Sequence, residues 1–170
     1  MRLVKAYVDF EFDEYNEDFQ KEFDTLGAES DDPIGQYIKL AKARGETRDT
    51  DPVLLELLIA LHRKVDELSA FIKNETKELL SLRYKTQIIA IGFEYFAISE
   101  PLFENKKYYG RMALPVFPKR EVPVIFEGID KTTAKILSMH ERDVKDYNAF
   151  ITARERAIIR ELKGKRWIGL

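Results

Sequence analysis

The chain has 170 residues, of which 45% are hydrophobic and 34% are charged, and its net charge is −2. This composition is typical of a soluble globular protein with one domain and an appendage, and it argues against a disordered chain or a membrane-spanning one. The absence of cysteine excludes disulfides, thiol catalysis and cysteine-bound zinc or iron–sulfur sites. Because the first twelve residues are interrupted by charges, we expect no signal peptide and a cytoplasmic location.

Residues 1–50 are expected to form a short acidic α/β appendage. Apolar residues alternate with polar ones over residues 4–12, which is typical of a half-buried strand. Apolar residues recur at helical spacing in residues 16–26 and 34–44, which predicts two short helices. Between positions 9 and 32 there are eleven acidic residues and one basic residue, Lys21. A solvated face explains this excess, and attraction to a basic surface is the alternative.

Residues 51–82 are predicted to form one long helix. Asp51 is suited to cap its first turn, and Pro52 to occupy the first helical position. At about 1.5 Å per residue the helix would be roughly 45 Å long. Its apolar residues follow a heptad rhythm that is clean for about three heptads, with positions d at Leu54, Leu61 and Leu68 and positions a at Leu58, Val65, Ile72 and Leu79.

The long helix carries more apolar surface than one seam requires. Leu55, Leu57 and Ile59 lie off the a/d positions near its start, and Phe71 widens the stripe. An ordinary core helix is one interpretation. We favour self-association through Leu54, Leu58, Leu61, Val65, Leu68 and Ile72, in a tetramer or at least a dimer.

Residues 83–170 are predicted to form a small antiparallel barrel closed by a helix. Residues 83–99 are rich in β-branched and aromatic residues, and alternation recurs around residues 112–116, 122–126 and 132–139. Several short strands joined by turns are typical of a closed barrel. An amphipathic stripe over residues 142–163 predicts the closing helix.

The order of these features resembles a PilZ domain, the bacterial module known for binding cyclic di-GMP. The resemblance covers about residues 87–162 and is strongest in the closing helix, at Asp143, Phe150, Ile151, Arg154 and Arg156. It implies a six-stranded barrel, and a setting in cyclic di-GMP signalling that controls type IV pilus or flagellar motility.

The two ligand motifs of that family are not found in their usual places. No serine is preceded two residues earlier by Asp or Asn, so the [DN]-x-S-x-x-G motif is absent, and Ala90, Gly92 and Tyr95 stand near the equivalent place. The RxxxR spacing occurs at 44–48 and at 156–160, but neither lies just ahead of residues 83–99. Arg83 lies near that place, with Gln87 four residues on. The chain thus resembles a degenerate subset that lacks both motifs and forms tetramers through a long heptad helix.

Other chemistry has little support in the sequence. His62 and His140 are too few for a metal cluster and are expected to flank the seam and to cap or pack. No Walker A loop, GxSxG elbow or GxGxxG occurs. Trp167 is either an anchor for a partner or packed on the barrel. These observations argue against an enzyme, and a hydrolase is a remote possibility.

The sequence therefore predicts an α+β protein. A short N-terminal α/β appendage (1–50) and a long heptad helix (51–82) precede a six-stranded PilZ-like antiparallel barrel with a closing C-terminal helix (83–170). We expect a non-enzymatic binding and assembly module that needs no cofactor or metal and does not bind nucleic acid. A protein partner in pilus or flagellar signalling is expected. The alternative is a receptor for cyclic di-GMP that uses displaced arginines, namely Arg44, Arg48 and Arg83.

Overall fold

The computed structural model describes residues 2–28, 33–72, 79–116 and 120–168, with side chains undescribed at residues 28, 33–35, 70 and 165–168. The chain divides into two units, one of Met1–Asp24 with Leu80–Leu170 and one of Thr25–Leu79. The strands are β1 (Val4–Glu14), β2 (Tyr84–Ile91), β3 (Tyr95–Ile98), β4 (Lys107–Leu114), β5 (Arg120–Gly128) and β6 (Thr133–Ser138). The helices are α1 (Glu17–Ala28), α2 (Pro33–Ala43), α3 (Pro52–Ile72) and α4 (Glu141–Ile168).

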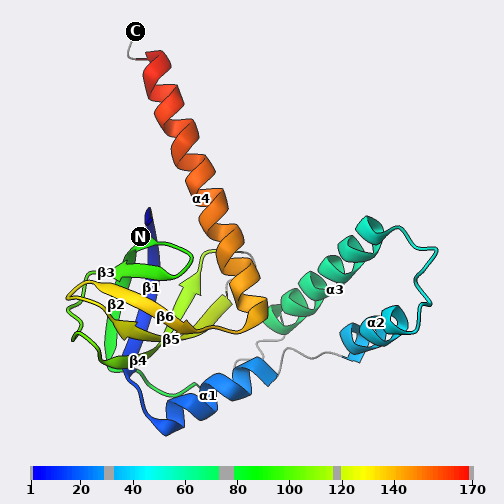
Figure 1. Ribbon diagram of the computed structural model, residues 1–170, viewed down its shortest axis with the longest axis horizontal. Coiled ribbons are helices and arrows are strands. Elements are labelled where there is room, and N and C mark those ends of the chain that lie inside the picture. Colours follow the sequence, from blue (N-terminus) through cyan, green and yellow to red (C-terminus); the bar gives the residue numbers. More distant parts are fainter. Residues whose placement is uncertain (1, 29–32, 73–78, 117–119, 169–170) are drawn as a thin grey trace. The chain divides into compact units, whose positions relative to one another are not determined.

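The six strands form a closed antiparallel barrel in the order β1-β2-β3-β6-β5-β4 (Figure 1). The predicted α+β class and the six-stranded barrel are confirmed. Closure depends on β1, which pairs with β2 on one side, Phe10 opposite Thr86, and with β4 on the other, Phe10 opposite Met112.

The arrangement of the helices differs from the prediction. Residues 83–170 supply five strands, and the strand expected in an N-terminal appendage is the sixth. The long helix therefore does not precede the barrel, because it lies in the chain between the first two barrel strands. Alternation along residues 4–12 predicts a half-buried strand but carries no information about which strands it pairs with.

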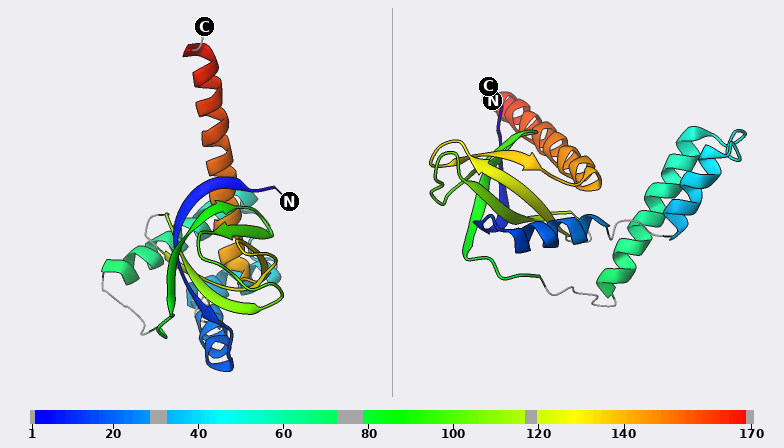
Figure 2. Two further views of the ribbon diagram at one scale, coloured as in Figure 1. Left: turned by 90° about the vertical axis from the view of Figure 1, so that its left-hand side faces the viewer. Right: turned by 60° about the horizontal axis from the view of Figure 1, so that its bottom comes forward.

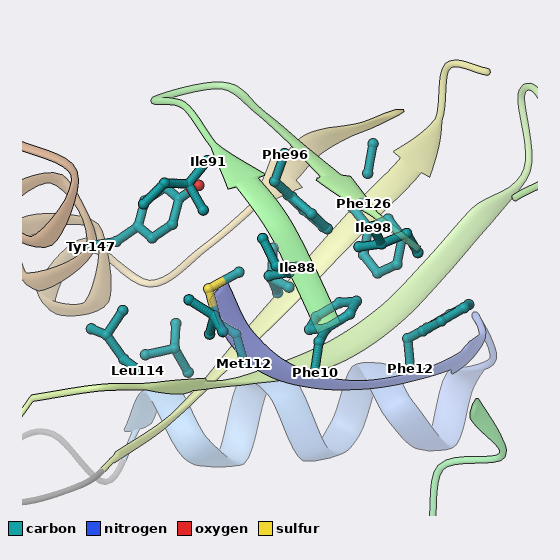
Figure 3. Packing of buried hydrophobic residues seen from close by; sticks show 14 of the residues in the cluster. Phe10, Phe12, Ile88, Ile91, Phe96, Ile98, Met112, Leu114, Phe126 and Tyr147 are labelled. Carbon is teal, nitrogen blue, oxygen red and sulfur yellow. The ribbon is translucent and has the colours of Figure 1, made fainter. Parts of the chain in front are cut away.

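The interior of the barrel is aromatic. Every second residue of β1 from Ala6 to Phe12 is buried, as the pleat of a strand requires. The Phe10 ring lies 5.4 Å from the ring of Phe96 and 5.6 Å from that of Phe126, as Figure 3 shows in close-up. Rings at this separation interlock in tilted or edge-to-face pairs, which add to the burial of apolar surface.

Helix α4 closes one end of the barrel with its first turns (Figure 2). Tyr147 and Ile151 are both 1% exposed and belong to the barrel core. The Tyr147 hydroxyl donates to the carbonyl oxygen of Gly92 at 2.7 Å. Arg120, at the start of β5, pairs with Asp143 and Asp146 on the first turns of α4. These contacts confirm the expected closing helix.

A second apolar cluster lies on the outer wall of the barrel. Phe19 and Phe23 of α1 pack there with Leu82, Tyr109 and Ile125. The Phe19 and Tyr109 rings are stacked with their centroids 5.3 Å apart. The helix expected at residues 16–26 thus exists, and its apolar face covers the barrel wall.

Helix α3 begins as predicted and is shorter than predicted. The Asp51 carboxylate accepts a hydrogen bond from the Val53 N–H at 2.9 Å, which caps the first turn. The helix extends to Ile72, which makes it about 32 Å long. Residues 73–78 of the expected helix lie outside the described residues, and residues 79–82 are not helical. Leu79 is therefore not a seam position.

Candidate functional site

The described seam residues line one face of α3 and are largely exposed within the single chain. Leu68 is half-buried. On the opposite side of the helix, Leu55 and Ile59 are half-buried, and α3 contacts α2 within the second unit. The exposed fractions along the seam are 52% at Leu54, 51% at Leu58, 61% at Leu61, 55% at Val65 and 70% at Ile72.

Polar residues occupy the sides of α3 away from the seam. His62 lies 3.6 Å from the Asp66 carboxylate, and Arg63 lies 3.5 Å from Glu67, both at i,i+4 spacing. Such pairs on an exposed helix each contribute only a few tenths of a kcal/mol. They therefore add little to the stability of α3.

The barrel end near the start of β1 gathers basic side chains. Arg2 pairs with Glu155 of α4, and the Arg154 guanidinium donates to the Lys5 carbonyl oxygen at 3.1 Å. A Cβ on Gly92 would lie 2.5 Å from the carbonyl oxygen of Arg2. The turn after β2 and the residue before β1 are therefore in direct contact.

This neighbourhood is where the [DN]-x-S-x-x-G motif would stand by resemblance. Ala90 and Gly92 present no polar side-chain group there, and the side chain of Tyr95 is half-buried. Phe93, in the turn between β2 and β3, is 58% exposed. This end of the barrel therefore has cations and the exposed ring of Phe93. It lacks the small polar side chains that, by resemblance, would hydrogen-bond to the edge of a guanine base.

The structure does not bring the three candidate arginines together on one element. Arg83 precedes β2, whereas Gly92 follows it, and eight strand residues separate them by about 27 Å. The backbone N–H of Arg83 donates to the Asp13 carboxylate at 3.2 Å. A hydrogen bond to Tyr84, and after it the negative charge of Asp13, raises the pKa of the Arg83 guanidinium. Arg44 and Arg48 are exposed and belong to the second unit.

Sequence reasoning missed a buried polar cluster around Arg111. One Glu22 oxygen accepts from the Tyr109 hydroxyl at 2.5 Å and from Arg111 at 2.9 Å. The other accepts from the backbone N–H of Leu80 at 2.6 Å, and Arg111 donates to the Leu80 carbonyl oxygen at 2.8 Å. Arg111 also lies 3.6 Å from Glu11. An arginine within the apolar strand YYGRMAL was the available signal, because a buried guanidinium needs a partner.

The hydroxyl of Tyr109 in this cluster is held in its neutral form. Burial, followed by the hydrogen bond to Glu22, raises the pKa of Tyr109, so its hydroxyl stays protonated at neutral pH. His140 is occupied in packing, since its ring stacks on Phe23 at 3.9 Å and its Nε2 lies 2.6 Å from the Phe23 carbonyl oxygen. Across the described ranges, no group of three or more His, Cys, Asp or Glu residues could hold a metal ion.

In the part of the chain that the structure describes, no helix combines the length and the apolar character needed to cross a membrane. The side chain of Trp167 lies outside the described residues, so both interpretations of it stay predictions.

Comparisons with known proteins found no significant match among family models, curated proteins or solved structures.

Proposed function

We propose that this protein is a non-enzymatic, PilZ-like binding and assembly module that self-associates through α3 as a tetramer or dimer. Its setting is cyclic di-GMP-linked motility of bacteria, at type IV pili or flagella. The observation that carries the proposal is the row of apolar side chains on α3, each more than half exposed in the single chain: Leu54, Leu58, Leu61, Val65 and Ile72.

The magnitude of the exposed surface favours assembly. Burying a whole aliphatic side chain contributes about 1.5–3 kcal/mol, so covering the exposed half of each contributes roughly 1 kcal/mol. Two helices that cover five such residues each would gain on the order of 10 kcal/mol, against an association cost of about 4–15 kcal/mol. A pair is therefore near balance, and a bundle of more helices, which also covers Val53 and Leu57, is favoured.

The PilZ part of the proposal rests on resemblance together with the barrel. A closed six-stranded antiparallel barrel with a helix inserted in one end is what the resemblance implies. Two of the residues quoted for it have structural roles at that junction, because Asp143 pairs with Arg120 and Ile151 enters the core.

Sedimentation equilibrium tests the assembly. The wild-type protein is expected to be a tetramer or dimer at tens of micromolar, and Leu61→Asp to shift it towards monomer, since the carboxylate would be buried unpaired in the seam. Ala60→Asp is the matched control, because Ala60 is exposed, adjacent and off the seam. A monomeric wild-type protein, or equal effects of the two variants, contradicts the proposal.

We further propose that cyclic di-GMP is not bound in the usual way. The receptor alternative needs arginines just ahead of the first barrel strand, and because that strand is β1, this place belongs to Arg2 and not to Arg83. Arg2 and Lys5 do not match the RxxxR spacing, and Arg2 is paired with Glu155.

Titration calorimetry with cyclic di-GMP separates the two functions. We expect no binding at micromolar concentrations. Micromolar or tighter binding would overturn the non-binding proposal, and its loss in Arg83→Ala, in Arg44→Ala with Arg48→Ala, or in Arg2→Ala would show which arginines bind the nucleotide.

A further inference from the structure

Helix α4 extends well beyond the barrel that it closes. Within the described residues, its contacts with the barrel run from Asp143, paired with Arg120, to Glu155, paired with Arg2. Figures 1 and 2 show the remainder of the helix projecting away from the strands. This remainder, residues 156–168, is called the distal half of α4 here.

The apolar stripe of α4 continues along the distal half. Ile158 and Leu162 lie seven and eleven residues after Ile151, so they fall within about 40° of it around the helix. Ile151 is buried in the barrel, whereas Ile159 is 44% and Leu162 57% exposed. The distal half thus presents an apolar face to solvent.

The polar side of the distal half, away from this face, is basic. Arg156, Arg160 and Lys163 are exposed. Residues 154–166 contain six basic and two acidic residues, a net charge of +4 in a protein whose net charge is −2. Two such helices would repel each other, so the stripe is not suited to pairing with its own copy.

The acidic surface of the same unit faces elsewhere. Glu17, Asp18 and Asp24 are exposed on α1. In Figure 1 and in the left view of Figure 2, α1 and the distal half of α4 lie on opposite sides of the barrel. An approach to a negative surface is therefore favourable through α4 and unfavourable through α1.

We propose that the distal half of α4 docks on an anionic lipid bilayer surface. A helix with an apolar stripe and a polar face rich in Lys and Arg lies in the plane of the bilayer interface, with its apolar residues among the acyl chains and its cations attracted by the negative lipid phosphates. Ile159 and Leu162 supply the apolar contact. Arg156, Arg160 and Lys163 supply the attraction to the phosphates.

The chain contains a built-in probe for this contact. Its single tryptophan, Trp167, lies within the distal half, so its fluorescence reports on this helix alone. Full-length protein is mixed with vesicles of phosphatidylglycerol and phosphatidylcholine, or of phosphatidylcholine only. We expect a blue shift of the Trp167 emission and co-sedimentation with the anionic vesicles only, both weakened by salt.

Two variants and one control test the residues. Ile159→Ser with Leu162→Ser, and Arg156→Glu with Arg160→Glu, should each lower vesicle partitioning at least about tenfold. All four positions are exposed, so the thermal unfolding midpoint should be little changed. Tyr37→Ser with Leu40→Ser, two exposed apolar residues of α2 that belong neither to the seam of α3 nor to α4, should leave partitioning unchanged.

Several outcomes overturn the proposal: no binding to anionic vesicles, equal binding to both vesicle types, or binding insensitive to both α4 variants. A blue shift that grows with protein concentration without lipid would assign the face to self-association. An equal shift with polyglutamate would assign it to an acidic protein. The oligomeric state is measured separately, so failure here does not affect the assembly proposed for α3.

Discussion

Glu22 accepts a hydrogen bond from the backbone N–H of Leu80 at 2.6 Å, although 58 positions separate them in the sequence. Arg111 also holds the backbone of Leu80, because its guanidinium donates to the Leu80 carbonyl oxygen. The chain therefore leaves the barrel unit just after Glu22 and returns to it at Leu80, beside its point of departure. The unit Thr25–Leu79 is therefore an insertion into the connection between β1 and β2.

The insertion should be removable. Replacing Thr25–Leu79 by a short Gly/Ser linker is expected to leave a folded barrel, because both ends of the linker attach at neighbouring points and a flexible loop costs little to close. Urea unfolding should show one cooperative transition, and sedimentation should give a monomer. The control is full-length Leu61→Asp, expected to be monomeric while retaining α3. A shortened chain that fails to fold would show that the insertion contributes to the barrel.

Removing Glu22 should destabilise the barrel strongly. Arg111 is 5% exposed, and Glu22→Leu would leave its guanidinium short of a buried partner. Breaking a buried ion pair costs about 3–5 kcal/mol, and we expect the lower end of that range because Glu11 remains 3.6 Å away. The measurement is the free energy of unfolding in urea.

Replacing both partners distinguishes charge burial from lost packing. Glu22→Leu combined with Arg111→Met removes the unpaired charge and fills similar volumes, so most of the lost stability should return. Equal instability of the single and double variants would mean that the hydrogen bonds to Leu80 and Tyr109, and not the charge, matter most.

Gly110 should not tolerate a side chain, because the core residue Phe10 occupies the space that a Cβ would need. A Cβ at this position would lie 2.4 Å from the ring of Phe10, which is locked in the core. Gly110→Ala is expected to cost about 1–3 kcal/mol by overpacking. The control is Gly164→Ala in α4, where a Cβ meets no atom within 4 Å, and a gain of up to about 1 kcal/mol is expected from helix propensity. Chemical denaturation of both variants tests the difference.

Alternation predicted β1 well, as in Ala6, Val8, Phe10 and Phe12. It predicted β4 less well, because β4 begins at Lys107 and its residues from Tyr108 to Met112 are all buried, so that half of the strand shows no alternation. It could not predict that β1 closes the barrel, because pairing with β2 and β4 is decided by contacts far along the chain. For β1 the alternation predicted the right residues, and only the strands that pair with it were unknown.

The end of α3 and the site residues illustrate two other limits. Leu80 and Leu82 continue an apolar pattern that suits a helix, but Glu22 and Arg111 bind the Leu80 backbone, and Leu82 is buried beside Phe19 and Phe23. Tertiary contacts override the local pattern there. The RxxxR spacing indicates Arg44 and Arg48, and a barrel that begins near residue 83 indicates Arg83. Because the first barrel strand is β1, Arg2 is the arginine that precedes the barrel.

Asp130 gives the stability a dependence on acidic pH. Its carboxylate accepts from the backbone N–H groups of Thr132, at 2.9 Å, and Thr133, at 2.8 Å, and these bonds, Thr132 first, lower the pKa of Asp130. A carboxyl whose pKa is lower in the folded state stabilises the fold at pH values above its ordinary pKa of 3.8, and that contribution is lost as the pH falls through the folded pKa.

Asp130→Asn mimics the protonated side chain. This variant should therefore unfold at a lower urea concentration than wild type at neutral pH, and the difference between the two midpoints should disappear in acid. Glu100→Gln, an exposed change in the loop before β4, should show no such convergence. A constant difference between wild type and Asp130→Asn from neutral pH into acid would mean that the turn is held by its geometry and not by the charge of Asp130.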